Sequence, residues 1–210
     1  MIKILIADDH SIVREGLKQI VATEKDLIVN GEAGGASELF AQLEQKSFDI
    51  VVLDINMPGR SGLDILKDMN TRFPNIPVLI LSMYNEEQYG IRAVKAGASG
   101  YLKKVSAPEE LVNAIKKIVG GGKYISPALT ESLVKTISIK SSKPAHENLS
   151  NREFEIMCKI AEGKSAEDIA KELSISVHTF YSYRNRIFEK MNLKSNVEIT
   201  QYVLQNKLGD

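Results

Sequence analysis

The first part of the chain alternates short apolar runs with longer amphipathic stretches. The apolar runs are rich in β-branched residues and predict strands at residues 2–8, 27–32, 50–54, 77–82 and 100–103. The stretches between them repeat apolar residues every three or four positions, which predicts helices at residues 12–21, 36–45, 62–72, 86–96 and 108–119. Strand and helix pairs joined by short connections indicate a parallel, doubly wound α/β sheet.

Two of these helices have clear apolar faces, which we expect to pack against the sheet. The first face carries Ile12, Val13, Leu17, Ile20 and Val21, and the second carries Leu39, Phe40 and Leu43.

The pattern changes after Gly120-Gly121-Gly122. Residues 127–137 form a short amphipathic piece, and residues 138–148 are rich in Ser, Lys, Pro and Asn without an apolar period, as in a flexible interdomain linker. From Leu149 onward only short helices are predicted, and three of them start with the Ser-x-x-acid spacing of a capping box. We therefore predict an α/β domain at residues 1–122, a linker with a short helix at 123–148, and an all-α domain at 149–210.

The third strand ends in a carboxylate, Asp54, and Asn56-Met57-Pro58-Gly59 then turns the chain. Taken alone, Asp54 could be a residue that caps this turn. Other polar side chains also follow strands: Asp8 and Asp9 the first, Ser82 the fourth and Lys104 the fifth. Because parallel strands end at one edge of the sheet, we expect these groups to converge there.

Clustered carboxylates would repel one another unless a cation lay among them, and Mg²⁺ is the hard, oxygen-seeking ion that suits such a site. Lys104 adds a positive point charge and Ser82 a hydroxyl donor. These groups around a central Asp54 predict phosphoryl transfer to that carboxylate.

Asp8-Asp9, the stretch from Leu53 to Gly59, Ser82, and Gly100-Tyr101-Leu102-Lys103-Lys104 together resemble the receiver domain of bacterial two-component response regulators. The resemblance implies a flavodoxin-like fold in which Asp54 accepts a phosphoryl group from the histidine of a sensor kinase. It also implies a Mg²⁺ site, with Asp9, Asp54 and the backbone carbonyl of Asn56 as ligands and Asp8 acting through water. The family lysine stands three residues after the aromatic, which assigns it to Lys104, and Val105 replaces the proline that often follows.

By the same resemblance, Ser82 would bind the phosphoryl group and Tyr101 would move with it as a switch. An ordinary half-buried aromatic of a strand remains the alternative for Tyr101. Asn56 and Tyr84 are expected to flank the pocket.

The last part of the chain has the order of a helix-turn-helix, with a tight turn at Ser174-Ile175-Ser176 before a helix at residues 177–191. Residues 149–210 hold nine Lys or Arg against nine Asp or Glu, so this domain is not basic as a whole. Residues 177–194, however, carry four basic residues and one acidic residue, as a DNA phosphate backbone requires locally. We predict DNA contacts from the outer face of this helix, at His178, Thr179, Tyr181, Ser182, Asn185, Arg186 and Lys190. A solvated helix in a protein-binding bundle is the alternative.

Residues 147–208 also resemble the LuxR-type DNA-binding domain, through Leu149-Ser150-Asn151-Arg152-Glu153, Ile169-Ala170, Leu173 and Ser176 to Thr179. The whole chain is thus similar to transcriptional regulators of the NarL/FixJ type. It departs from the family at His178-Thr179-Phe180-Tyr181, where Lys-Thr-Val-Lys is usual, and at Tyr183, where His is usual. Arg184 is a candidate partner of Glu153. By the resemblance, Val197, Val203 and Leu204 would help to form the DNA-bound dimer.

Composition narrows the setting. The single cysteine, Cys158, excludes an internal disulfide, and we expect a cytoplasmic protein without a membrane segment. The expected partners are a sensor histidine kinase, double-stranded DNA and, in the active state, a second copy of the chain.

Two rival functions stay open at this point. One is a Mg²⁺-dependent phosphohydrolase with an aspartyl-phosphate intermediate, although such enzymes often have a second Asp where this chain has Asn56. The other is a receiver used only for protein interaction that never carries phosphate. Our reading is a regulator rather than an enzyme, with at most self-phosphorylation and self-dephosphorylation at Asp54.

Overall fold

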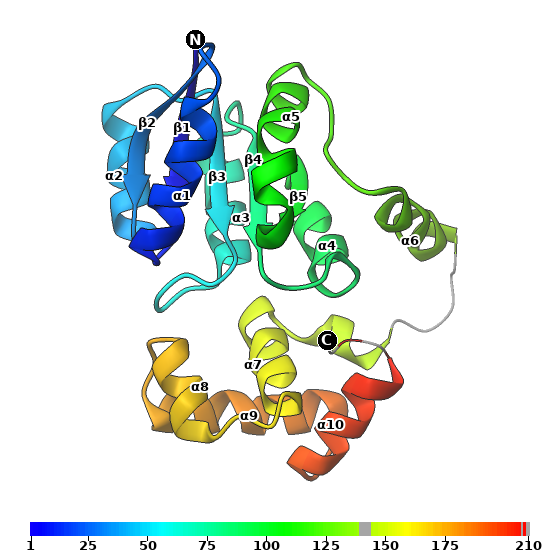
Figure 1. The fold of residues 1–210 in the computed structure, drawn as a ribbon. Coiled ribbons are helices and arrows are strands. Elements are labelled where there is room, and N and C mark those ends of the chain that lie inside the picture. The colour runs from blue at the N-terminus through cyan, green and yellow to red at the C-terminus, as the bar shows by residue number, and fades with distance from the viewer. Residues whose placement is uncertain (139–143, 207, 209–210) are drawn as a thin grey trace. The chain divides into compact units, whose positions relative to one another are not determined.

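The computed structural model describes residues 1–138, 144–206 and 208. It divides into two compact units, Met1–Leu133 and Val134–Asp210, which are described separately below. Figure 1 shows the α/β unit and the all-helical unit that follows it. Among the described residues, no helix is both long and apolar enough to cross a membrane.

The first unit is built on a parallel five-stranded sheet with the order β2-β1-β3-β4-β5. This order confirms the predicted doubly wound fold. The central strands are buried on both faces because helices cover each side, which explains their continuous apolar runs. The strands are β1 (Ile2–Ala7), β2 (Leu27–Ala33), β3 (Ile50–Asp54), β4 (Val78–Ser82) and β5 (Gly100–Lys103).

Five helices follow the strands in turn, and a 3₁₀ helix, η1 (Lys104–Ser106), precedes the last of them. Helices α1 and α5 pack on the face of the sheet turned to the viewer in Figure 1, and α2 and α3 lie behind it. Apolar side chains of α1 and α5 meet alternate residues of β1, β3, β4 and β5 to form one core. The helices are α1 (Ser11–Ala22), α2 (Ala36–Gln45), α3 (Gly62–Arg72), α4 (Glu86–Lys95) and α5 (Ala107–Val119).

The predicted apolar face of the first helix was wrong at Ile12. Ile12 is 79% exposed, whereas Leu17 and Val21 are buried. Successive helical residues point about 100° apart, which turns Ile12 away from the face that Val13 and Leu17 share. Phe40 is only half-buried, and its ring stacks on Phe73 at 6.4 Å between centroids.

The segment after α5 returns to the sheet beside β5. Tyr124 pairs in parallel with Gly100, since its carbonyl accepts from the Tyr101 N–H and its own N–H donates to Ser99. Helix α6 (Pro127–Ser138) then begins against α4: the Ser126 N–H donates to Glu86, and Leu129 is buried over Gly90. The first turns of α6 therefore belong to the α/β unit.

Within the described residues, the second unit contains the end of α6, a 3₁₀ helix and four further α-helices, of which α7 packs mainly against α9 and α10. This arrangement confirms the predicted small all-α domain. The predicted linker of residues 138–148 is only partly covered, because residues 139–143 lie outside the described residues. The elements are η2 (Ala145–Asn148), α7 (Asn151–Ala161), α8 (Ala166–Glu172), α9 (Val177–Met191) and α10 (Asn196–Gln205).

Serine residues start the helices of this unit, as the spacing predicted. Ser150 accepts from the Glu153 N–H while the Glu153 carboxylate accepts from the Ser150 N–H, which completes a capping box. Ser176 caps α9 in the simpler way, by accepting from the Thr179 N–H. Ser174 in the turn before α9 has a φ of 51°, in the left-handed region.

Candidate functional site

Strand register places the polar side chains that follow β1, β3, β4 and β5 next to one another, at the carboxyl ends of the strands. Ala7 pairs with Leu53, so the residues that follow them, Asp8 and Asp54, lie side by side. On the other flank of β3, Asp54 pairs with Leu81, which puts Ser82 one residue further along the edge. Because Ser82 in turn pairs with Lys103, Lys104 starts at the same edge. The convergence that we predicted from strand ends is thus present in the fold.

Lys104 reaches back between two buried carboxylates. Its Nζ lies 2.6 Å from Asp8 Oδ2 and 2.8 Å from Asp54 Oδ2. Asp8 is 1% and Asp54 2% exposed, so little water can weaken these ion pairs. Lys103, the neighbouring candidate, instead donates to Asn85.

The electrostatics of this triad follow from burial and charge. Burial raises the pKa of Asp54 to about 6, because the lowering effect of Lys104 is opposed by the neighbouring Asp8. Burial would lower the pKa of Lys104, but its contacts with Asp54 and Asp8 outweigh this effect and raise it. The lysine therefore stays charged.

The Asp54 carboxylate has an oxygen without a hydrogen-bond partner within the described chain. Asp54 Oδ1 makes no hydrogen bond, although the opposite oxygen of the same carboxylate is bonded to Lys104. Ligand atoms of Asp8, Asp9, His10 and Asp54 all lie within 4.8 Å of one another. An unsatisfied carboxylate oxygen among further carboxylates is a donor set that fits a divalent cation such as Mg²⁺. Asn56 lies in the loop after β3, where it bridges to Ser61.

Ser82 and Tyr101 are connected through the loop after β4. Ser82 is fully buried, and its Oγ accepts from the Tyr84 N–H at 3.1 Å. The Tyr101 hydroxyl donates to the Tyr84 carbonyl at 2.9 Å. Tyr101 is buried rather than half-buried, and this burial raises its pKa. The ring of Tyr84 stacks on that of Tyr89 with 4.5 Å between centroids.

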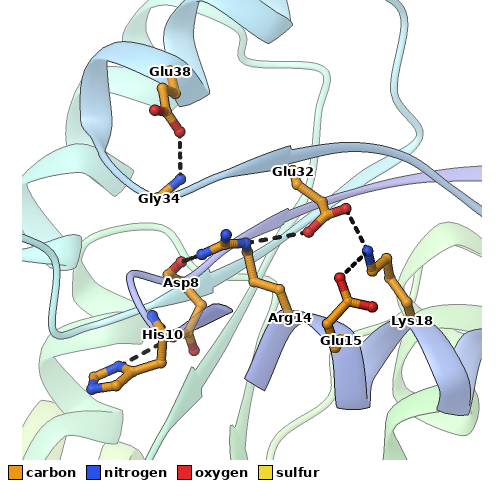
Figure 2. Close-up of polar contacts among 8 residues, drawn as sticks. All are labelled: Asp8, His10, Arg14, Glu15, Lys18, Glu32, Gly34 and Glu38. Carbon is orange, nitrogen blue, oxygen red and sulfur yellow. Dashed lines mark hydrogen bonds and ion pairs between the residues drawn. The ribbon is translucent and has the colours of Figure 1, made fainter. Parts of the chain in front are cut away.

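Figure 2 shows a second layer of charged residues that the sequence analysis missed. Arg14, from α1, donates to the Asp8 carbonyl at 2.7 Å and to the Glu32 carboxylate at 3.2 Å. Lys18 holds the other oxygen of Glu32 at 2.8 Å, and hydrogen bonds from Lys18 and Arg14 lower the pKa of Glu32. The loop that carries Asp8 is therefore anchored to both α1 and β2. Glu32 stands near the end of its strand, so the strand-end argument that found Asp8 could also have found it.

Gly62, the first residue of α3, approaches the site backbone very closely. A Cβ at this position would lie 2.1 Å from the Asp54 carbonyl oxygen and 2.8 Å from the Ile55 Cα. Only a residue without a side chain fits there, because neither backbone atom can move without shifting the end of β3.

In the second unit, α9 buries Phe180, Ile187 and Met191, as predicted. Its opposite face is open, with Tyr181 40% exposed and Arg186 exposed. Thr179 is half-buried, and its hydroxyl bonds that of Ser176 at 2.8 Å. The remaining predicted contact residues are exposed: His178, Ser182, Asn185 and Lys190.

The expected pairing of Arg184 with Glu153 was wrong. Lys190 occupies that place, with its Nζ 2.7 Å from Glu153 Oε2. Arg184 instead lies over two aromatic rings, 4.7 Å from the centroid of Tyr181 and 5.4 Å from that of Phe188. These rings stand one helical turn before and after Arg184, which makes the stack local to α9.

Comparison with known families identifies both units. Residues 4–116 match the response regulator receiver domain, and residues 147–203 match the bacterial regulatory proteins of the luxR family. Oxygen regulatory protein NreC of Staphylococcus epidermidis is 37% identical over 214 residues, which cover 98% of each chain. Response regulator UvrY of Escherichia coli is 31% identical over 209 residues, 99% of this chain and 96% of the relative.

Solved structures agree on the fold. A LuxR-family two-component response regulator from Aurantimonas sp. is 32% identical and superposes with a TM-score of 0.59, covering 65% of this chain and 98% of that one. RcsB of Salmonella enterica bound to the promoter rprA covers 97% of this chain and 98% of its own at 23% identity, with a TM-score of 0.65. With a receiver domain and a LuxR-type domain in one chain, the protein belongs to the NarL/FixJ-type response regulators.

Proposed function

We propose that Asp54 is the phosphoacceptor and that its phosphorylation controls DNA binding by α9. The carrying observation is the buried Asp54 carboxylate, with Lys104 on one oxygen and no hydrogen-bond partner on the other within the described chain. A carboxylate held this way is aligned by a cation yet keeps an oxygen for reaction.

In the proposed reaction, an ionised oxygen of Asp54 attacks the phosphorus of a phosphohistidine on a sensor kinase. A phosphorus–oxygen bond forms as the phosphorus–nitrogen bond breaks, and the kinase imidazole leaves with the bonding electron pair. Lys104 is within reach of the oxygens around Asp54 and offsets the charge that gathers on the transferred group. Self-phosphorylation from small donors and self-dephosphorylation at Asp54 belong to the same proposal.

Mg²⁺ is the proposed cofactor. Asp9, Asp54 and the Asn56 backbone carbonyl would hold it, with Asp8 acting through water. When bound, the ion supplies positive charge that neutralises the phosphoryl oxygens. The donor set supports this choice, because the acidic side chains of the cluster offer hard oxygen ligands.

The proposed switch runs through Ser82 and Tyr101. A phosphoryl group on Asp54 draws the Ser82 hydroxyl toward it, which competes with the Tyr84 N–H that now donates to that hydroxyl. Tyr84 also accepts from Tyr101, so a shift at Ser82 disturbs the hydroxyl contact of Tyr101 as well. Ser82 and Tyr101 would thus be coupled, because both bond to the backbone of Tyr84.

The test is intact-mass analysis after incubation with acetyl phosphate and Mg²⁺. Wild-type protein should gain one phosphoryl mass, and Asp54→Asn should gain none. An adduct that persists in Asp54→Asn would refute the assignment. Steady turnover of a phosphate ester that depends on Asp54 would instead favour the phosphohydrolase, and an unmodified wild-type chain would favour the phosphate-free interaction module.

For the second unit, we propose that α9 enters a groove of double-stranded DNA. His178, Thr179, Tyr181, Ser182, Asn185, Arg186 and Lys190 would contact bases and phosphates. The exposed apolar pair Val197 and Leu204, one helical repeat of seven apart on α10, supports a dimer of the active protein. Val203, also expected in the dimer, is buried within the unit and supports α10 from inside. We also propose a cytoplasmic location, because the protein would act on DNA.

DNA binding is tested by selecting fragments from a random pool with and without phosphoryl donor. Enrichment of one palindromic site that strengthens with phosphorylation is expected. The domain limits proposed from sequence, 1–122, 123–148 and 149–210, are tested separately by limited proteolysis of the full chain.

A further inference from the structure

His10 stands directly beside the acidic cluster and has no part in the proposed phosphoryl transfer. Its Nδ1 lies 2.7 Å from Asp9 Oδ1 and 3.5 Å from Asp8 Oδ1. The side chain is 63% exposed, so solvent and dissolved ions reach it freely. Figure 2 shows the imidazole beside Asp8, with a dashed line that leaves the ring. The backbone N–H of His10 also donates to Asp8 Oδ1.

The carboxylate oxygens of the cluster divide into two sides. Lys104 takes Oδ2 of Asp8 and Oδ2 of Asp54. The Oδ1 atoms of Asp8 and Asp9 lie near the His10 ring, and Asp54 Oδ1 is the buried oxygen without a hydrogen bond in the described chain. Lys104 thus takes one oxygen each of Asp8 and Asp54, while one possible ligand atom from each residue of the cluster, the His10 imidazole included, lies within 4.8 Å of the others.

Nitrogen and oxygen ligands select different ions. Mg²⁺ keeps to oxygen, whereas Zn²⁺, Co²⁺ and their neighbours bind imidazole well and exceed Mg²⁺ in affinity for mixed nitrogen and oxygen sites. We propose that His10 is a ligand for borderline divalent cations, so that Zn²⁺ or Co²⁺ displaces Mg²⁺ from this receiver. This inference rests on the proposed cation site at Asp9 and Asp54.

The consequence is a phosphorylation site that responds to which metal ion is present. With Mg²⁺, His10 stays outside the ligand set and the ion keeps positions open for phosphoryl oxygens. With Zn²⁺ or Co²⁺, the imidazole occupies one of those positions and ties the exposed loop to the ion. Phosphorylation from acetyl phosphate should therefore fall when Zn²⁺ is added in the presence of Mg²⁺.

The experiment titrates Co²⁺ into the full-length protein and follows its visible ligand-field absorption, with Mg²⁺ affinity measured by calorimetry. His10→Ala should weaken Co²⁺ binding about tenfold or more, since even indirect partners of metal ligands cost that much. The same substitution should leave Mg²⁺ affinity unchanged. His10→Asn, which keeps a polar group but no imidazole, should behave like His10→Ala.

His146→Ala is the matched control, because that histidine lies in η2 of the other unit, outside the acidic cluster. It should change neither affinity. Equal losses for both ions in His10→Ala would reduce His10 to a structural role, and unchanged Co²⁺ affinity would overturn the proposal outright. If wild type binds neither ion, or Asp9→Asn leaves Mg²⁺ binding intact, the underlying cation site fails instead.

Discussion

The acidic edge of the receiver sheet and the outer face of α9 differ in what holds their side chains. At the sheet edge, Asp8, Asp54 and Ser82 are buried and fixed by strand register. On α9, Tyr181 and Arg186 are exposed, and their cation–π contacts, with Arg184 and Tyr183 respectively, are made within their own helix. The first site is therefore organised before any partner arrives, whereas we expect the second to set its side-chain rotamers only when a partner binds.

This difference sets how each site responds to substitution. A buried charge cluster has few alternative arrangements, so removing one member leaves uncompensated charge. An exposed helix face can adjust its rotamers, so a single loss is shared among neighbours. We therefore expect large, specific effects at the sheet edge and smaller, graded ones on α9.

The largest effect should come from Lys104. Lys104→Met removes the cation between Asp8 and Asp54 and should slow phosphorylation by about a hundredfold, as loss of one charge-stabilising group usually does. Lys103→Met is the matched control, since Lys103 contacts Asn85 instead. Stopped-flow or mass-resolved time courses with acetyl phosphate compare the two. Equal slowing in both variants would contradict the assignment.

Gly62→Ala probes the backbone support of the same edge. The added Cβ would overlap the Asp54 carbonyl, so we expect the α/β unit to lose about 2 kcal/mol of unfolding free energy. Hydrogen exchange of β3 and α3 amides in the full chain measures the loss. Gly35→Ala serves as the control, because no heavy atom lies within 4 Å of its Cβ position. Similar exchange in both variants would show that the close approach is not limiting.

Arg186→Ala tests whether α9 binds through graded electrostatics. We expect DNA affinity to fall by a few fold and the slope of log affinity against log salt to decrease in magnitude by about 1. Fluorescence anisotropy on a selected site at several salt concentrations gives both values. A weaker affinity with an unchanged slope would assign Arg186 to folding or to base contact rather than phosphate contact.

The smallest effect concerns Glu153 and acid stability. Burial tends to raise the pKa of Glu153, but the hydrogen bonds from Lys190 and Ser150 outweigh burial and lower this pKa below the ordinary 4.5. Its stabilisation is therefore present above pH 4.5 and is lost as pH falls through the lowered folded-state pKa. Lys190 is partly exposed, so we expect Glu153 to contribute only about 0.5 kcal/mol to the free energy of unfolding.

Glu153→Gln should flatten this acid dependence when α7 amide exchange is followed from neutral pH downward. Glu167→Gln, an exposed substitution on α8, is the control and should leave the profile of the wild type. A profile that stays as steep in Glu153→Gln would move the origin of the acid dependence elsewhere.

The fold and the buried half of the site were predictable because they follow from chain order. Parallel strands have one carboxyl edge, so Asp54, Ser82 and Lys104 had to approach one another once the strands were recognised. The anchoring of the Asp8 loop by Arg14 was not predictable in this way. It depends on how α1 is rotated and on a register shift between Ile4 and Leu5 opposite β2, which no local pattern records.

In the helical unit, the partner of Glu153 could likewise not be predicted from the sequence. Arg184 and Lys190 lie about 120° apart around α9, so only the crossing of α7 and α9 decides which of them meets the carboxylate. Helix periodicity identified the buried residues Phe180 and Ile187 correctly, because apolar residues at helical spacing form the face that packs inward.

The pairing of Tyr124 with β5 has a consequence for solubility. An outermost strand with unpaired backbone groups is a template for another chain, and Tyr124 covers part of this one by bonding to Ser99 and Tyr101. A fragment that stops at Gly122 would uncover those groups and should self-associate through its sheet. A fragment that continues to Leu133 keeps the cover and should remain monomeric without phosphoryl donor, as light scattering would distinguish.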